Sequence, residues 1–365
     1  MDKKFVMGIA AMAALTLVSC SSDDLDSLSD NSSKNEAISF DGYLGRSAVA
    51  VNGTRGSVET KETLKKNGFG VFSKYTGTAS FPDFNNQPVT YSKSKWTYTP
   101  LKFWPAQGQI DFLAYAPYDA NTVLNTTTDG KKTSSIDFAV ADKVANQKDL
   151  LWANATGHQI TGNIASTKET VKFLFKHALS RLGYTIKLSG DYASNNVKFT
   201  LDKITLAGSA PESATKAFYT GGTIDLSTGK WTSKKTTKQD FEWFSGTYQN
   251  LSTTASNPDK DNNYLFVIPQ DFSQSKTTEN PNVDELYVIV QYTITYPDGG
   301  GTQTNTVYKQ LKQNFLQGKA YMLNLTIGIP IEFDIDVDIV SGVEDWGNDN
   351  VIPDGKDIDT WDGIE

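Results

Sequence analysis

The sequence predicts an all-β protein. Its apolar residues fall in short runs rich in Val, Ile, Phe, Tyr and Thr, which are separated by Gly, Asn, Asp and Pro. Some runs alternate strictly, as residues 331–339 do (Ile-Glu-Phe-Asp-Ile-Asp-Val-Asp-Ile), and this alternation is typical of an antiparallel strand buried on one face. Such strands, repeated at short spacing without amphipathic helices between them, indicate sandwiches or barrels.

The expected elements follow the apolar runs along the chain. We expect strands at residues 37–40, 68–72, 109–115, 171–175, 182–188, 197–206, 264–268, 286–296, 321–327 and 331–339. Two segments, residues 59–66 and 177–182, could form short helical turns. A polar stretch at residues 154–169 carries two glycines and no apolar cluster, so we expect a domain boundary there.

The amino-terminal residues predict export and lipidation. Lys3 and Lys4 precede an apolar run that ends at a small residue, which is the pattern of a secretory signal peptide over residues 1–19. Leu17-Val18-Ser19-Cys20 resembles the lipobox of bacterial lipoproteins, which implies that Cys20 is acylated and becomes the mature amino terminus. Each buried CH₂ of an acyl chain contributes about 0.8 kcal/mol, so two or three chains anchor a protein stably.

Residues 20–36 are polar and acidic, and we expect them to form a lipidated flexible tether. Acidic residues directly after the lipidated cysteine also resemble the surface-export signal of Bacteroidetes lipoproteins. That resemblance implies an anchor in the outer membrane with the protein facing the medium, although a plain solvated linker has the same composition.

Composition argues against several functions. The net charge is −8 and the basic residues are scattered, so a nucleic-acid footprint is not expected. Cys20 is the one cysteine, which excludes disulfides, zinc ribbons and a cysteine nucleophile from the mature domain. The two histidines, His158 and His177, are too few for a histidine-based triad or metal site and are expected to be structural or solvated.

Enzymatic chemistry is therefore not expected, and we predict no catalytic residue, no cofactor and no metal site. The carboxylates Glu242, Asp284 and Glu285 stand in no hydrolase motif. The acidic tail at residues 343–365 has the residue types of a calcium loop but not its spaced bidentate glutamate, so a solvated tail is the preferred interpretation. Aromatic residues such as Trp231, Trp243 and Phe244 could line a glycan platform, but most aromatics in sandwiches belong to the core.

A known family shares the order of the strand motifs. Asn-Gly-Phe-Gly-Val-Phe at residues 67–72 is followed by further blocks at residues 86–91, 96–105 and 111–118, and together they resemble the first domain of the fimbrillin-like family of Bacteroidales. Residues 148–153 and 171–182 are similar to the junction and opening strand of its second domain. Residues 318–327 and 343–346 are similar to its end.

This resemblance implies a type V pilin or pilus accessory lipoprotein built as two transthyretin-like antiparallel β-sandwich domains in tandem. The expected division is a signal peptide at residues 1–19, a lipidated tether at 20–36, an N-terminal β-sandwich at 37–160, a C-terminal β-sandwich at 161–342, and an acidic tail or donor strand at 343–365.

The resemblance also implies an assembly route. A trypsin-like surface protease cuts after an arginine near the first strand, that strand leaves, and a strand from another pilin subunit enters the groove. Arg55, in Gly-Thr-Arg-Gly, is the preferred site and Arg46, in Leu-Gly-Arg-Ser, is the second candidate. Residues 331–339 or the tail from residue 343 would be the donor, because acidic alternation discourages premature pairing.

A second hypothesis is a solitary or pilus-tip surface lipoprotein that binds a glycan or a host protein without polymerising. A third, an unrecognised hydrolase, would require a cleft with a perturbed pair of carboxylates.

Overall fold

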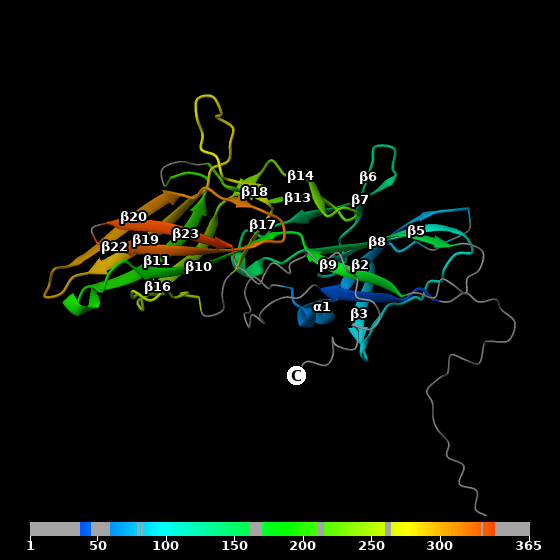
Figure 1. Cartoon of the computed structure of the whole chain (residues 1–365), viewed down its shortest axis with the longest axis horizontal. Helices are drawn as coiled ribbons and strands as arrows, with labels where there is room; N and C mark the ends of the chain where they lie inside the picture. The colour runs from blue at the N-terminus through cyan, green and yellow to red at the C-terminus, as the bar shows by residue number, and fades with distance from the viewer. Residues whose placement is uncertain are drawn as a thin grey trace, which may run out of the picture.

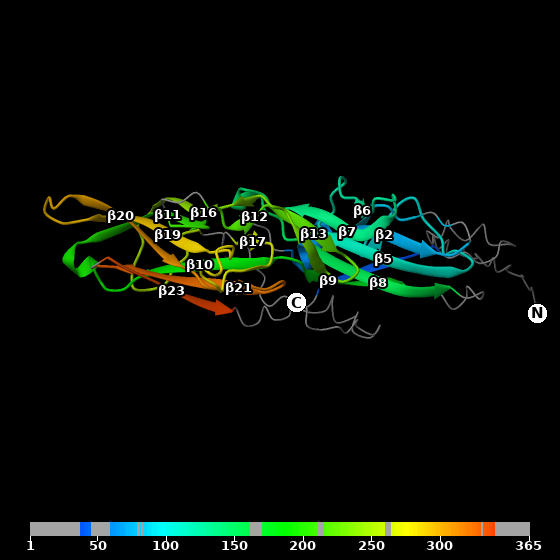
Figure 2. The ribbon, with the colours of Figure 1, turned by 90° about the horizontal axis from the view of Figure 1, so that it is seen from above.

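The computed structural model describes residues 37–44, 59–78, 81, 83–160, 170–210, 215–259, 264–329 and 331–339. The molecule is elongated, and the strands of the first and second halves of the chain lie toward opposite ends (Figures 1 and 2). The expected all-β fold is confirmed, because the described strands form six sheets and the described residues contain one α-helix, α1 (Lys61–Asn67).

The first half of the chain builds a seven-stranded sheet in the order β1-β9-β8-β5-β2-β3-β4. Its strands are β1 (Phe40–Leu44), β9 (Val171–His177), β8 (Leu151–Ile160), β5 (Gly108–Ala116), β2 (Phe69–Thr76), β3 (Gln87–Ser92) and β4 (Lys95–Thr97). All neighbours are antiparallel except β1 and β9, which are parallel. The strands β8 and β9, on either side of the expected boundary at residue 160, therefore belong to the same sheet.

The second half of the chain builds two four-stranded sheets. One contains β17 (Leu265–Val267), β10 (Ser180–Leu188), β22 (Ala320–Gly328) and β23 (Glu332–Ile339). The other contains β16 (Phe241–Tyr248), β11 (Lys198–Ala207), β19 (Tyr287–Thr295) and β20 (Thr302–Gln310). Strict alternation of burial along β19 shows the period of two that its sequence predicts.

A further four-stranded sheet joins the halves. It has the order β14-β13-β7-β6, with β7 (Lys132–Ala139) and β6 (Leu124–Thr126) from the first half and β13 (Gly221–Asp225) and β14 (Lys230–Lys234) from the second. Five residue pairs connect β7 and β13 in antiparallel register. Two smaller pairs, β12 (Phe218–Tyr219) with β15 (Lys238–Gln239) and β18 (Gln270–Asp271) with β21 (Asn314–Phe315), complete the sheets.

The two expected helical segments have different outcomes. Helix α1 begins after Thr60, whose hydroxyl accepts from the Thr63 amide in a capping box, and it ends at Gly68 with a φ of 66°. The helical turn expected at residues 177–182 is wrong, because this segment holds the end of β9 and the start of β10. There Ala178 N donates to Leu150 O and Arg181 N to Lys319 O, so backbone pairing between distant strands replaces local helical bonds.

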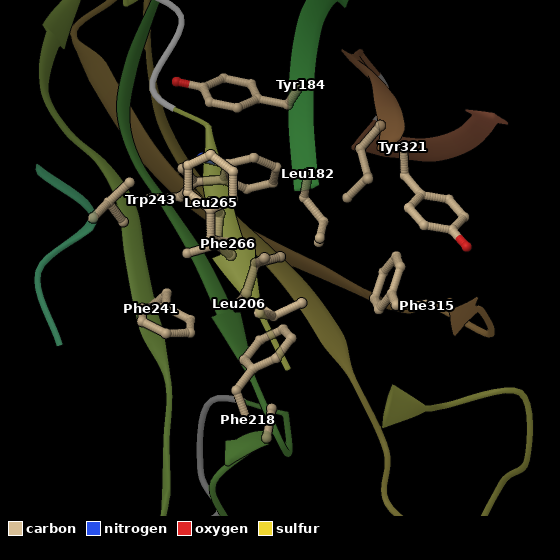
Figure 3. Packing of buried hydrophobic residues seen from close by; sticks show 14 of the residues in the cluster. Leu182, Tyr184, Leu206, Phe218, Phe241, Trp243, Leu265, Phe266, Phe315 and Tyr321 are labelled. Carbon is tan, nitrogen blue, oxygen red and sulfur yellow. The ribbon is translucent and has the colours of Figure 1, made fainter. Parts of the chain in front are cut away.

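Buried apolar residues form two clusters. The first core is formed by residues of the seven-stranded sheet and of segments packed against it. It is rich in phenylalanine, with Phe40, Phe69, Phe84, Phe112, Phe173 and Phe175 among its members. The second core fills the second half and continues into the junction through residues such as Phe72, Leu113 and Leu150. Figure 3 shows part of this second core, where residues from several strands meet, including Leu182, Trp243, Phe266 and Tyr321.

Candidate functional site

The first strand, β1, is an edge strand with one hydrogen-bonded neighbour in the sheet order. It pairs in parallel with β9 in the register from Phe40 and Val171 to Leu44 and Phe175. Val171 N donates to Ser39 O over 2.9 Å. Because β1 has five residues and a single strand partner, few backbone bonds hold it in the sheet.

The side chains of β1 and the residue before it nonetheless fill the first core. Ile38, Phe40 and Leu44 are 1%, 4% and 9% exposed. The ring of Phe40 packs edge-on against Phe84 and Phe112, with centroid distances of 5.1 and 5.5 Å. Each such burial contributes about 1.5–3 kcal/mol, so the first core depends on a segment that is weakly tied to the sheet by its backbone.

The chain entering β1 is tied to the loop after β4. Ile38 N donates to Lys102 O over 2.8 Å, and the Tyr98 hydroxyl donates to Ile38 O over 2.7 Å. Ala37 and Phe103 form an antiparallel bridge. Burial raises the pKa of Tyr98, so its hydroxyl stays a donor at neutral pH.

Gly42, in the middle of β1, packs against aromatic rings of the first core. A Cβ at this position would lie 3.0 Å from Phe69 Cε1, 3.4 Å from Phe175 Cε2 and 3.6 Å from Trp96 Cε2. A side chain at this position would require the Phe69 ring to shift by a few tenths of an ångström. Neighbouring Tyr43 donates its hydroxyl to Asp41, and burial together with this carboxylate raises the pKa of Tyr43.

A cleft of about 310 Å³ lies beside β1, between it and the β3–β4 hairpin. Trp96 and Tyr91 meet edge-on at 5.1 Å, and Lys65 Nζ lies 4.6 Å from the centre of the Tyr91 ring. Its lining also includes Ser39, Asp41, Ser94, Lys95 and Thr170. A larger cavity of about 400 Å³ lies near the junction and includes Tyr115, Asp119, Phe138 and Lys148 in its lining.

Charged residues are buried where the seven-stranded sheet meets the second half. Glu59 N donates to Asp149 Oδ2 over 3.1 Å, and His177 Nδ1 lies 2.7 Å from the same oxygen. Asn67 donates to Glu59 Oε1 over 2.9 Å, and Arg181 is 6% exposed. Burial, and then the charge of Asp149, raise the pKa of Glu59 to about 7. These contacts connect the chain just before α1 to the chain just before β8 and to His177 at the end of β9.

The segment at residues 331–339, expected as a possible donor, forms β23 on the edge of its own sheet. It pairs with β22 from Glu332 and Gly328 to Ile339 and Tyr321. Its apolar residues Phe333, Ile335 and Val337 are only partly buried. Asp334 pairs with Lys309, which lowers the pKa of that carboxyl, and Ile339 is 57% exposed.

The residues predicted for lipidation and processing, Cys20, Arg46 and Arg55, lie outside the described residues, as does the tail from residue 340. The described chain ends at Leu44 and resumes at Glu59, so both arginines belong to the segment between β1 and α1.

Sequence reasoning did not single out Gly42 or the buried set around Glu59. A glycine inside an apolar strand pattern was the available signal for Gly42, whereas the Glu59 set is assembled from distant segments.

Within the described ranges, no group of three or more His, Cys, Asp or Glu residues is placed to hold a metal ion. The described helix α1 is too short to span a membrane, and no described helix meets that requirement.

Fold and site define an all-β protein whose first core is completed by its own first strand. The model of the family described as fimbrillin-like matches residues 54–346, and the chain belongs to that family, as its strand motifs predict. The match begins after β1.

Two known proteins resemble the chain in sequence or fold. The fimbrium subunit Fim1C of Phocaeicola vulgatus is 30% identical over 203 residues, which are 50% of this chain and 51% of that protein. The chain thus aligns with about half the length of this curated relative. The crystal structure of a fimbrial protein from Bacteroides vulgatus has a TM-score of 0.60 and 21% identity, with coverage of 84% of this chain and 99% of that one.

Proposed function

We propose that the protein is an exported surface lipoprotein that acts as a structural or adhesive subunit of a type V fimbria. In this account Cys20 carries the lipid that anchors the protein in the outer membrane. Residues 37–160 and 161–342 form the main parts of two transthyretin-like sandwiches, with β9 and the β13–β14 hairpin contributing to the first half. Membership of the fimbrillin-like family and the resemblance to Fim1C support this proposal.

Assembly would proceed by donor-strand exchange triggered by a trypsin-like surface protease. Cleavage after Arg55 or Arg46 would separate β1 from α1 and the rest of the chain. The observation that carries this step is the contrast within β1, whose apolar side chains are buried in the first core while its backbone pairs with β9 alone. Once β1 departs, the unpaired edge of β9 and the open core would form a template for an incoming strand.

Limited trypsin digestion of the purified protein tests this proposal. We expect cleavage after Arg55 or Arg46, read by N-terminal sequencing of the large fragment, followed by ladder-like oligomers on size analysis. An Arg46→Gln/Arg55→Gln double variant is the control and should remain intact and monomeric. A wild-type protein that is cut at these sites and stays monomeric would contradict assembly by strand exchange.

The alternative function is a solitary or pilus-tip lipoprotein that binds a glycan or a host protein. The cleft beside β1 supports this alternative, because Trp96 and Tyr91 offer ring surfaces beside polar groups such as Asp41 and Ser39. A Trp96→Ala variant would then lose binding to an oligosaccharide array without a change in oligomeric state. Absence of array binding by the wild-type protein would remove the glycan part of this alternative.

A further inference from the structure

The cavity near the junction, of about 400 Å³, lies within the size range of small-molecule sites. Its described lining residues, all between 115 and 150, come from the end of β5 and the loop after it, the end of β7 and the residues that follow, and the turn before β8. Much of this lining is apolar, because Ile136, Val140 and Leu150 are buried and the Phe138 ring is partly buried. Such a wall can cover one face of a small ligand.

The polar groups of the lining carry both signs of charge. Asp119, Asp137, Asn146 and Lys148 line the cavity and are exposed to solvent. A ligand with a net charge would be repelled either by the carboxylates or by the ammonium group. A hydroxyl group would not, because it can donate to a carboxylate and accept from an ammonium group. The lining therefore fits an uncharged, hydroxylated ligand that also has an apolar face.

We propose that this cavity binds a neutral sugar ring at the end of a glycan chain. The apolar C–H face of a pyranose would pack against the Phe138 ring. Its hydroxyl groups would donate to Asp119 and Asp137 and accept from Lys148. The inference rests on the adhesive role proposed above and deepens it, because it names a ligand class and a site other than the cleft beside β1.

Both carboxylates are oriented by hydrogen bonds to one of their two oxygens. Asn121 N donates to Asp119 Oδ1 over 2.9 Å. Thr223 Oγ1 and Asn125 Nδ2 donate to Asp137 Oδ1 over 2.6 and 2.9 Å, and these bonds lower the pKa of that carboxyl. Asp137 is therefore an ionised acceptor at neutral pH. Each carboxylate keeps its second oxygen, Oδ2, as an acceptor for a ligand hydroxyl.

The walls of the cavity are held by bonds within the protein. The Tyr115 hydroxyl donates to Asp119 O over 2.7 Å, which ties the loop after β5 to that strand. Val140 N donates to Thr220 O over 2.9 Å, and the turn before β8 contains the 3₁₀ helix η2 (Val144–Asn146). A ligand that enters such a preformed site has little chain to order, which reduces the entropic cost of binding.

The position of the cavity in the chain predicts how processing affects it. All of its described lining residues follow Arg46 and Arg55 in the sequence, so cleavage at either arginine leaves them on the same fragment. The cleft beside β1 differs, because Ser39 and Phe40 belong to its lining and would leave with β1. A glycan bound in the cavity should therefore bind the uncut and the trypsin-cut protein equally.

A glycan array that carries neutral and sialylated oligosaccharides of animal and plant origin provides the probe. The labelled wild-type protein is compared with Ala139→Phe, which adds a ring to an exposed lining residue, and with Lys148→Ala. The matched controls Ala193→Phe and Lys187→Ala change exposed residues of the second half. We expect wild type and both controls to bind neutral members of the array, and the members bound identify the origin of the glycan. Ala139→Phe should lose this binding.

Titration calorimetry with a neutral oligosaccharide bound on the array gives the affinities. We expect Lys148→Ala to bind at least about tenfold more weakly than wild type, and trypsin-cut wild type to bind with unchanged affinity. Far-ultraviolet circular dichroism confirms the fold of each variant. Lys148→Ala changes an exposed side chain and so keeps the test decisive if Ala139→Phe does not fold.

Several results would overturn the inference. Wild type that binds no neutral glycan, or binds sialylated members alone, would exclude the proposed ligand class. Full binding by both Ala139→Phe and Lys148→Ala would exclude the cavity as the site. Binding that is lost in Trp96→Ala or on trypsin cleavage, but kept in the cavity variants, would assign the glycan to the cleft beside β1. Oligomer formation by the cut protein is scored separately, so failure here leaves the assembly proposal to its own test.

Discussion

The indole nitrogen of Trp231 donates a hydrogen bond of 2.8 Å to the carbonyl oxygen of Ala178. Trp231 lies on β14, and Ala178 lies in the short connection between β9 and β10, where the chain leaves the seven-stranded sheet. The same hairpin is fixed by Asn154 on β8, which donates to Ser227 O over 2.6 Å. The β13–β14 hairpin, from the second half of the chain, is thus hydrogen-bonded to residues of the first half. We therefore expect the two halves to unfold together.

Replacing Trp231 with phenylalanine keeps a ring near Phe138 but removes the bond to Ala178. We expect Trp231→Phe to lower the free energy of unfolding by about 1 kcal/mol, with one cooperative transition retained. Guanidinium denaturation followed by far-ultraviolet circular dichroism measures this change, with the exposed neighbour Lys230→Ala as control. Identical stability of Trp231→Phe and wild type would show that this bond does not hold the hairpin.

The turn between β13 and β14 provides a sharper probe. Gly229 has a φ of 71°, and a Cβ there would overlap the Trp152 ring, whereas Gly299 has a φ of 80° and nothing within 4 Å. Both alanine variants carry the left-handed backbone penalty of about 1 kcal/mol, but only Gly229→Ala displaces a ring. We expect losses of about 3 kcal/mol for Gly229→Ala and about 1 kcal/mol for Gly299→Ala by denaturant unfolding. Equal losses of stability would mean that the Trp152 ring moves aside without a measurable cost.

The pKa of Glu59, raised to about 7, predicts a pH-dependent stability. The folded state holds this proton more tightly than the unfolded state, so stability falls as pH rises from about 4.5 to 7 and stays low above that range. The loss reaches at most about 3 kcal/mol. The groups near Glu59 that share this environment are Lys148, Asp149, His177 and Arg181.

The amide of Glu59→Gln cannot ionise. We therefore expect the free energy of unfolding of Glu59→Gln, relative to that of wild type, to be higher at pH 8 than at pH 5. Thermal unfolding at the two pH values measures this, and the exposed Glu62→Gln on α1 is the matched control. If the stabilities of Glu59→Gln and wild type changed with pH by the same amount, the raised pKa of Glu59 would be wrong.

Phe40 tests the contribution of β1 to the first core. Phe40→Ala removes a ring that contacts Phe84, Phe112 and Phe173, and we expect a loss of about 3–5 kcal/mol together with faster cutting by trypsin. The exposed Leu316→Ala should change stability by less than about 0.5 kcal/mol. If Phe40→Ala were as stable as wild type, β1 would not support the core.

The sequence predicted the elements of this fold more completely than their partners. Alternation is a local signal, and it identified strands such as β19 and β23 because burial on one face imposes a period of two. The pairing of β13 with β7 joins residues that are far apart in the chain, and no local pattern specifies it. The helical turn that local sequence suggests at residues 177–182 is wrong for the same reason, since the backbone partners of this segment, Leu150 and Lys319, are remote in the chain.

In the candidate site, too, local sequence predicts the strand but not the contacts between distant segments. The apolar run at residues 37–40 predicts a strand from local sequence alone, and the structure places its residues Ile38 and Phe40 in the first core. The constraint at Gly42 arises from three rings on three other strands, and the raised pKa of Glu59 arises from burial beside Asp149. Neither could be derived from the sequence, because each depends on how separate strands converge.

The central claim is that β1 leaves its own subunit and is replaced during assembly. Mass spectrometry of size-separated products after trypsin cleavage tests it directly, by measuring whether the fragment containing residues 37–44 remains bound. The account predicts that cut monomers retain this fragment and that oligomers lack it. Oligomers that keep one copy of the fragment per subunit would contradict strand exchange.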